Sequence, residues 1–133
     1  MSVIRDDVMK KIPDGRLRLF VIWEPILPKD GVDALDDSSE MVQDEWRALQ
    51  FWDPNAESGK RIKRQFDLKI VNPAWDIYLL YPPGAKWEAD PPAPAYWMHQ
   101  LTFMPGGADE RRYGGLRLDT KRLRQEIETR LKR

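Results

Sequence analysis

The sequence contains no cysteine among its 133 residues. This absence excludes disulfide bonds, zinc sites built on thiolates, iron–sulfur clusters and thiol nucleophiles. Histidine is almost as scarce, since His99 is the only one. The chain also has no P-loop, no G-x-G-x-x-G, no H-E-x-x-H and no G-x-S-x-G, and we therefore expect no cofactor of the kinds that these motifs bind.

Two further features are missing, namely a long apolar run and an excess of charge of one sign. No stretch approaches the roughly 18 apolar residues of a membrane span, and the first fifteen residues lack the apolar core of a signal peptide. We therefore expect a cytoplasmic protein with no membrane partner. Lysine plus arginine equals aspartate plus glutamate at 22 each, which argues against a nucleic-acid partner.

The composition is that of a globular domain, with 41% hydrophobic and 33% charged residues. A chain of this length is expected to form a single domain, residues 1–133. Residues 1–14 are polar and are expected to form a loose N-terminal segment. The charge is uneven, because residues 30–45 carry seven acidic residues and no basic one, whereas residues 111–133 are mainly basic. Two solvated faces explain this pattern, and a head-to-tail contact between two copies is the alternative.

The apolar pattern predicts strands at residues 17–23, 75–81 and 96–103, and helices that begin near Asp37 and at Pro54. Residues 17–23 and 75–81 are apolar on both faces, which favours strands buried in the middle of a sheet. Residues 48–52 form either a short strand or the continuation of the preceding helix, and we favour the strand. A last helix follows Asp119, with apolar residues at a spacing of four: Leu123, Ile127 and Leu131.

The resulting order, βαβαββα, resembles the thioredoxin-like fold, an α/β architecture with a central four-stranded mixed sheet flanked by helices. More narrowly, the chain resembles a family of bacterial proteins of unknown function that share the pattern VIWEPILP, QFWD, WDIYLLYPPGAKW and PPAPAYWMHQL. Thioredoxins place C-x-x-C after the first strand, where this chain has residues 24–28, Glu-Pro-Ile-Leu-Pro. Asp76 stands where the resemblance implies a cis-proline. Thiol–disulfide oxidoreductase activity is therefore excluded.

Three residues are candidates for catalysis. His99 is the only side chain whose ordinary pKa lies near neutrality, and Asp76 on the expected neighbouring strand could orient it. Glu24 follows a predicted strand, at the end where ligands gather in α/β sheets. The simpler interpretation makes His99 a core residue and Glu24 a charge at the rim. The acidic residues 30–37 could bind a hard cation, but their spacing matches no EF-hand, and we predict no metal site.

The six tryptophans favour a binding surface instead, because one small core rarely buries so many. We predict a non-catalytic binding or interaction module that binds a protein or a small molecule and that can form a homo-oligomer. The alternative is a small enzyme or ligand-binding protein that uses His99 with Asp76 or Glu24. The predicted binding residues are Trp23, Glu24, Pro25, Trp87, Tyr96, Trp97 and His99.

Overall fold

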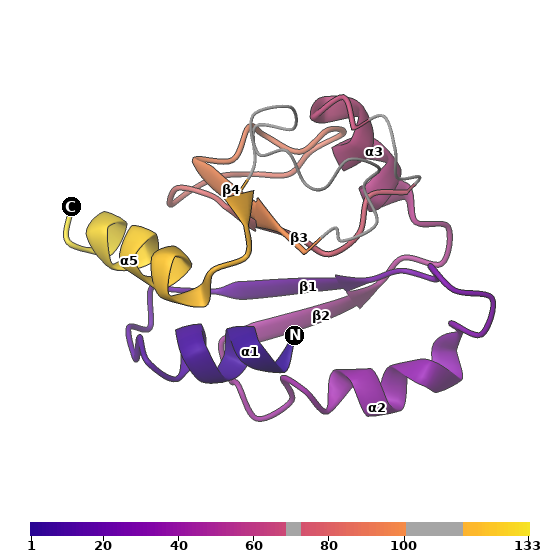
Figure 1. Ribbon diagram of the computed structural model, residues 1–133, viewed down its shortest axis with the longest axis horizontal. Coiled ribbons are helices and arrows are strands. Elements are labelled where there is room, and N and C mark those ends of the chain that lie inside the picture. Colours follow the sequence, from indigo (N-terminus) through magenta and orange to yellow (C-terminus); the bar gives the residue numbers. More distant parts are fainter. Residues whose placement is uncertain (69–72, 101–115) are drawn as a thin grey trace. The chain divides into compact units, whose positions relative to one another are not determined.

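The strands form two separate sheets in the computed structural model, which describes residues 1–68, 73–100 and 116–133 (Figure 1). The first sheet pairs β1 (Leu19–Trp23) with β2 (Ala48–Trp52) in parallel. In the second sheet, β4 (Tyr96–His99) lies between an antiparallel β3 (Ile77–Leu80) and a parallel β5 (Leu116–Arg117). The sheets belong to two compact units. The first unit is Met1–Ala56 with Thr120–Arg133, and the second is Glu57–Asp119.

The predicted thioredoxin-like fold with one central four-stranded sheet is therefore wrong. The elements from β1 to β4 do follow the predicted order along the chain. Among the described residues, however, β1 and β2 pair only with each other. The segment 75–81, expected at the centre, supplies β3, which lies at an edge and whose four residues are all half-buried. An apolar run identifies a strand but not its neighbours, because strand pairing is decided by distant parts of the chain.

The core of the first unit is built from buried apolar side chains of its N-terminal segment, of β1, of the connection between β1 and β2, and of the C-terminal helix: Ile4, Val8, Met9, Ile12, Val21, Val42, Leu123 and Ile127. The helix α5 (Thr120–Leu131) buries Leu123 and Ile127, which lie four residues apart on one face. It contacts η1 (Arg5–Met9), a short π-helical segment, and two polar contacts fix the pair. The Thr120 hydroxyl donates to the Asp7 carboxylate at 3.1 Å, and the Arg124 guanidinium donates to the Asp7 carbonyl oxygen.

The N-terminal segment contributes to this core. Within residues 1–14, expected to pack loosely, α1 (Ser2–Ile4) and η1 bury three apolar side chains: Ile4, Val8 and Met9. Ile4 and Val8 are four residues apart and therefore share one side of the helix. Ile12 is buried just beyond them. These apolar residues are separated by charged ones, and composition alone therefore predicts a loose segment. The expectation of a single domain over residues 1–133 stays a prediction.

The connection between β1 and β2 contains η2 (Val32–Ala34) and α2 (Leu35–Ser39). The sequence predicts that this helix begins near Asp37 and favours an end near Arg47, whereas the helix in the structure begins and ends earlier. Residues 48–52 form β2, so the strand interpretation is confirmed and the continuous helix is wrong. The Gln50 side chain donates to the Ser39 carbonyl oxygen at 3.3 Å, which fixes the inner face of β2 against the end of α2.

The second unit packs α3 (Glu57–Gln65) against its sheet. This helix begins three residues after Pro54, because Ala56 has a φ of 51° and interrupts the helical conformation. Its core contains Ile62, Leu68 and Ala74, and the Phe66 ring stacks on Trp97 with ring centroids 4.6 Å apart. The pattern of the helix expected to begin at Pro54 predicts that Ile62 and Phe66 face inwards, and the core contacts confirm this. In the described parts of the chain, no helix has the length and apolar character needed to cross a membrane.

Candidate functional site

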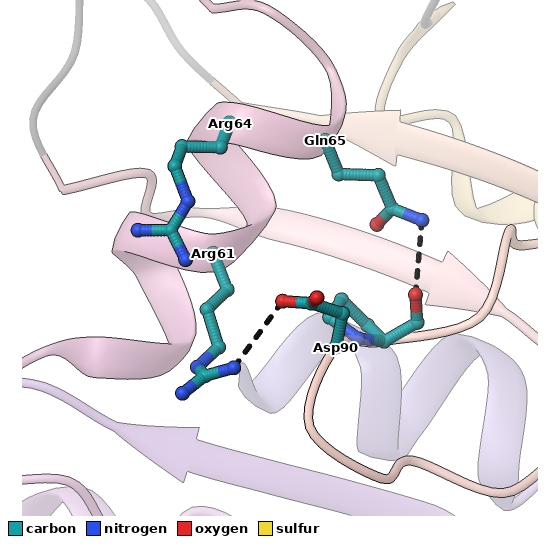
Figure 2. Close-up of a pocket in the computed structure, with 5 residues that line it drawn as sticks. Arg61, Arg64, Gln65 and Asp90 are labelled. Carbon is teal, nitrogen blue, oxygen red and sulfur yellow. Dashed lines mark hydrogen bonds and ion pairs between the residues drawn. The ribbon is translucent and has the colours of Figure 1, made fainter.

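A pocket of about 320 Å³ lies beside the C-terminal half of α3. Its lining residues come from the helix and from the loop that precedes β4: Arg61, Arg64, Gln65, Asp90 and Pro91. We call it the arginine pocket. Figure 2 shows the three helix residues extending from α3, with Asp90 opposite them. Arg61 and Arg64 are three residues apart and therefore lie on the same side of the helix.

The wall of the arginine pocket is fastened to α3 by side chains of the helix. The Arg61 guanidinium donates to the Ala89 carbonyl oxygen and forms an ion pair with the Asp90 carboxylate, with 3.2 Å between nitrogen and oxygen. The Gln65 amide donates to the Pro91 carbonyl oxygen at 3.1 Å (Figure 2). Pro91 itself is buried. The backbone of residues 89–91 is therefore held in place, whereas the Asp90 side chain remains 75% exposed.

The second notable surface is one face of the β1–β2 sheet. The register pairs Phe20 with Leu49 and Ile22 with Phe51, so that these four side chains share one face. All four are exposed, at 61% for Phe20, 53% for Leu49, 38% for Ile22 and 51% for Phe51. The rings of Phe20 and Phe51 lie nearly parallel, with centroids 6.4 Å apart. We call this surface the apolar face. Leu17–Trp23 was predicted to be buried on both sides, and this prediction is wrong for the exposed face.

Beside this sheet, Trp46 is the most exposed tryptophan of the described chain, at 73%. The guanidinium groups of Arg18 and Arg47 lie 5.2 and 5.9 Å from its ring centroid. Both distances are within the range of a cation–π contact. The apolar ring is therefore held at the surface by charged neighbours. Trp46 follows an acidic stretch, so nothing in the local sequence distinguishes it as more exposed than the other tryptophans.

A buried ion pair lies next to Trp46 in the sequence. The Arg47 guanidinium donates to both carboxylate oxygens of Glu45 at 2.7 Å, and also to the carbonyl oxygens of Met9 and Ile12. Glu45 is 8% exposed and Arg47 is 4% exposed. The hydrogen bonds from Arg47 hold the pKa of Glu45 below its ordinary value, against the opposing effect of burial. These groups join the N-terminal helices to the start of β2, and their role is structural.

The structure places His99 in the core of the second unit, with an exposed fraction of 0%. The residue opposite it on β3 is Ile77, and the Trp97 ring lies 5.9 Å away, centroid to centroid. Asp76 comes just before β3, and its carbonyl oxygen accepts a hydrogen bond from the Gln100 N–H. The register therefore sets Asp76 diagonally to His99. A base in this position would need an opening of the core to meet a substrate.

Asp76 has two unusual properties of its own. Its φ is 53°, in the left-handed region that few non-glycine residues adopt. Its side chain reaches the surface, but the surrounding protein removes enough water to raise the pKa of the carboxyl group. Burial also raises the pKa of the nearby Tyr78 to about 12, with a smaller contribution from the charge of Asp76. The Tyr78 hydroxyl donates to the Gln100 side chain at 2.6 Å.

The other predicted binding residues are divided between the two units. Trp23, Glu24 and Pro25 are half-buried in the first unit, where the Trp23 indole N–H donates to the Gln50 side chain at 2.8 Å. Trp87 and Tyr96 belong to the second unit, where Trp87 is 41% exposed and Tyr96 is half-buried. Trp97 is part of the core contacts around Phe66. Their role in binding stays a prediction.

The acidic segment offers no assembled metal site in the part of the chain that the structure describes, because no three of its histidine, aspartate or glutamate residues are grouped to hold an ion. Asp30 instead accepts the backbone N–H groups of Ile26 and Leu27 at 2.9 and 2.7 Å. This geometry closes the turn that follows β1, which is a common role for aspartate in loops.

Sequence reasoning missed both surfaces described above. The run Lys-Arg-Ile-Lys-Arg at residues 60–64 signals a basic helix, and the spacing of its arginines could have shown that they share one side. Asp90 and Pro91 contact α3 across 29 and 26 residues of the sequence, so that their contribution has no local signal. The exposure of the apolar face could not be predicted, because an uninterrupted apolar run indicates a strand that is buried on both faces.

Comparison with known proteins gives no assignment, since no protein-family model, no curated protein and no solved structure matches the chain. The likeness to a bacterial family with the WEPILP and YWMHQL motifs therefore stays a prediction.

Proposed function

We propose that the protein is a non-catalytic interaction module that pairs with a second copy of itself through the apolar face. The observation that supports this proposal is the exposure of four large apolar side chains on one face of the β1–β2 sheet. A parallel sheet normally has both faces covered, because its residues are apolar on both. In this protein the apolar face is exposed, and a second copy would cover it.

The apolar face suits a symmetric contact. It is built from two pairs of cross-strand neighbours, and the same patch on two copies can meet in a two-fold arrangement without any further component. Two stacked sheets would bury the Phe20 and Phe51 rings against those of the partner. The net charge of the chain is zero, so that no overall repulsion opposes the approach of two copies.

The size of the apolar face predicts a weak association. A half-exposed large side chain contributes roughly 100 Å² of new burial, which gives about 400 Å² for each copy. The total of about 800 Å² is below the roughly 1,200 Å² of a standard stable interface. We therefore expect a monomer–dimer equilibrium that depends on protein concentration, and not a permanent dimer.

The alternative, a small enzyme that uses His99 with Asp76 or Glu24, has less support. His99 is fully buried, so that a substrate could reach it only if the core opened. The raised pKa and the left-handed backbone of Asp76 are the observations that favour this alternative, since both occur often at functional sites. They concern a single carboxyl group, and catalysis of this kind requires a partner within reach.

Sedimentation velocity over a wide concentration range tests the proposal. We expect the wild type to shift toward a dimer as its concentration rises, and the double variant Phe20→Thr/Phe51→Thr to remain a monomer. Threonine retains the β-branched character suited to a strand, and circular dichroism checks that the variant is folded. The control is Leu27→Thr, which removes a side chain that is 65% exposed outside the apolar face. A wild type that is monomeric throughout, or a double variant that associates equally well, would contradict the proposal.

A further inference from the structure

The arginine pocket carries an excess of positive charge on one helix. Four cations occur within five residues of α3, and only Glu57 balances them on the same helix, through its ion pair with Lys60. Two of the four cations, Arg61 and Arg64, line the pocket. Like charges three residues apart on a helix repel each other. An anion bound between them would relieve this repulsion.

The two arginines of the pocket differ in their hydrogen-bond and ion-pair partners. Arg61 is held by the Ala89 carbonyl oxygen and by the Asp90 carboxylate. Among the described residues, no acidic side chain forms an ion pair with Arg64, and Arg64 is exposed. The pocket therefore contains two guanidinium groups and a single carboxylate, which leaves a formal charge of +1 facing the solvent.

Asp90 shows what kind of group the pocket accepts. Its carboxylate lies against Arg61 in the position that an oxyanion of a ligand would take. Because the Asp90 side chain is 75% exposed, its ion pair with Arg61 is a weak surface pair that a ligand can displace. The backbone of residues 89–91 would stay in place, since Arg61 and Gln65 hold its carbonyl groups.

We propose that the arginine pocket binds a phosphate group, with Arg61 and Arg64 as its ligands and Asp90 as a built-in competitor. Guanidinium groups bind phosphate oxygens through paired hydrogen bonds, and a dianion can satisfy two of them together. A carboxylate carries one negative charge and would only replace Asp90. The volume of about 320 Å³ is at the lower end for ligand pockets and suits free phosphate or a small phosphate ester.

Isothermal titration calorimetry with inorganic phosphate and with glycerol 3-phosphate, at low ionic strength, tests binding at the arginine pocket. We expect Arg64→Gln to lower the affinity about tenfold, the effect of losing one charge-assisted hydrogen bond. We expect Asp90→Asn to raise the affinity several-fold, because the competitor is gone. The matched control is Lys63→Gln, which removes the same charge from the same helix outside the pocket and should have a much smaller effect.

Arg64→Gln and Asp90→Asn are expected to change the affinity in opposite directions, which makes the test specific. Both substitutions are at exposed positions and leave the fold intact. Tighter binding of glycerol 3-phosphate than of inorganic phosphate would identify an ester as the ligand class, and equal binding would identify the free anion. The proposal is overturned if neither phosphate binds, if Lys63→Gln weakens binding as much as Arg64→Gln, or if Asp90→Asn weakens binding. Equal affinity for acetate would also overturn it.

Discussion

At the scale of single residues, the buried pair of Glu45 and Arg47 shows how a charged contact stabilises a fold. Arg47 is satisfied by the Glu45 carboxylate and by backbone carbonyl oxygens from the N-terminal helices. Because both side chains are almost fully buried, the removal of one would leave the other charge without compensation. The pair therefore stabilises the contact between the N-terminal segment and the first sheet, although the sequence shows only two charged residues in a polar loop.

We predict that Glu45→Gln lowers the free energy of unfolding by about 3 kcal/mol at neutral pH, the usual cost of breaking a buried ion pair. Glu57→Gln is the control, because it breaks an exposed pair with Lys60 and should cost only about 0.5 kcal/mol. Urea denaturation followed by circular dichroism measures both variants. Equal losses from the two substitutions would contradict the buried role of Glu45.

The same pair predicts a pH dependence. The pKa of Glu45 is lower in the folded state than its ordinary value of 4.5. Its stabilising contribution is therefore fully present above the pKa of the unfolded chain and is lost as the pH falls through the folded pKa. The difference in stability between the wild type and Glu45→Gln should decrease as the pH is lowered from about 4.5. A difference that stays constant down to the acid unfolding transition would contradict this linkage.

At the scale of secondary structure elements, α5 is stabilised by packing more than by its own propensity. Half of its residues are charged, and Leu123 and Ile127 are its two buried apolar residues. An isolated helix of 12 residues is marginal in water, so its stability must come from the contact with η1 and the core of the first unit. The N-terminal helices and the C-terminal helix therefore depend on each other.

We predict that Ile127→Ala lowers the free energy of unfolding by about 2–4 kcal/mol, because it leaves a cavity at a position that is 5% exposed. The N-terminal amides of residues 4–12 should also exchange faster with solvent, which hydrogen exchange by mass spectrometry can detect. Leu27→Ala, at a position that is 65% exposed, should change the stability by less than about 0.5 kcal/mol. Unchanged exchange in the N-terminal segment would argue against the coupling with α5.

At the scale of the whole molecule, the charge pattern and the apolar face suggest two different ways in which copies of the protein could associate. The acidic residues 30–45 and the basic residues 111–133 suggest a head-to-tail electrostatic contact. The apolar face suggests a symmetric hydrophobic one. Salt distinguishes the two, because it screens charges but does not weaken the burial of apolar surface.

We predict that self-association is unchanged or strengthened when sodium chloride is raised well above the physiological level, and that ammonium sulfate strengthens it. Sedimentation equilibrium at a fixed protein concentration measures this effect. A dimer that dissociates as salt is added would instead indicate the head-to-tail contact. If ammonium sulfate strengthens self-association and sodium chloride leaves it unchanged, the result agrees with the hydrophobic contact, because sulfate is excluded from the protein surface.

The sequence by itself determined the chemistry that the protein lacks and much of the order of its elements. The missing cysteines exclude thiol chemistry in any conformation. The strands at residues 48–52 and 96–99, the inward side of α3 and the last helix follow from local patterns of apolar residues. Helix boundaries were less predictable, since the start of α3 depends on the left-handed conformation of Ala56.

Only the tertiary structure decided how the strands pair and which residues share a surface. The division into two sheets, the burial of His99 and the exposure of Phe20 and Phe51 all depend on contacts between residues distant in the sequence. The arginine pocket likewise combines a helix with a loop about 25 residues further on. The sequence around an apolar or basic residue is the same whether or not another part of the protein packs against that residue. The physical reason is that burial depends on what packs against a residue, and this information is absent from its neighbours in the chain.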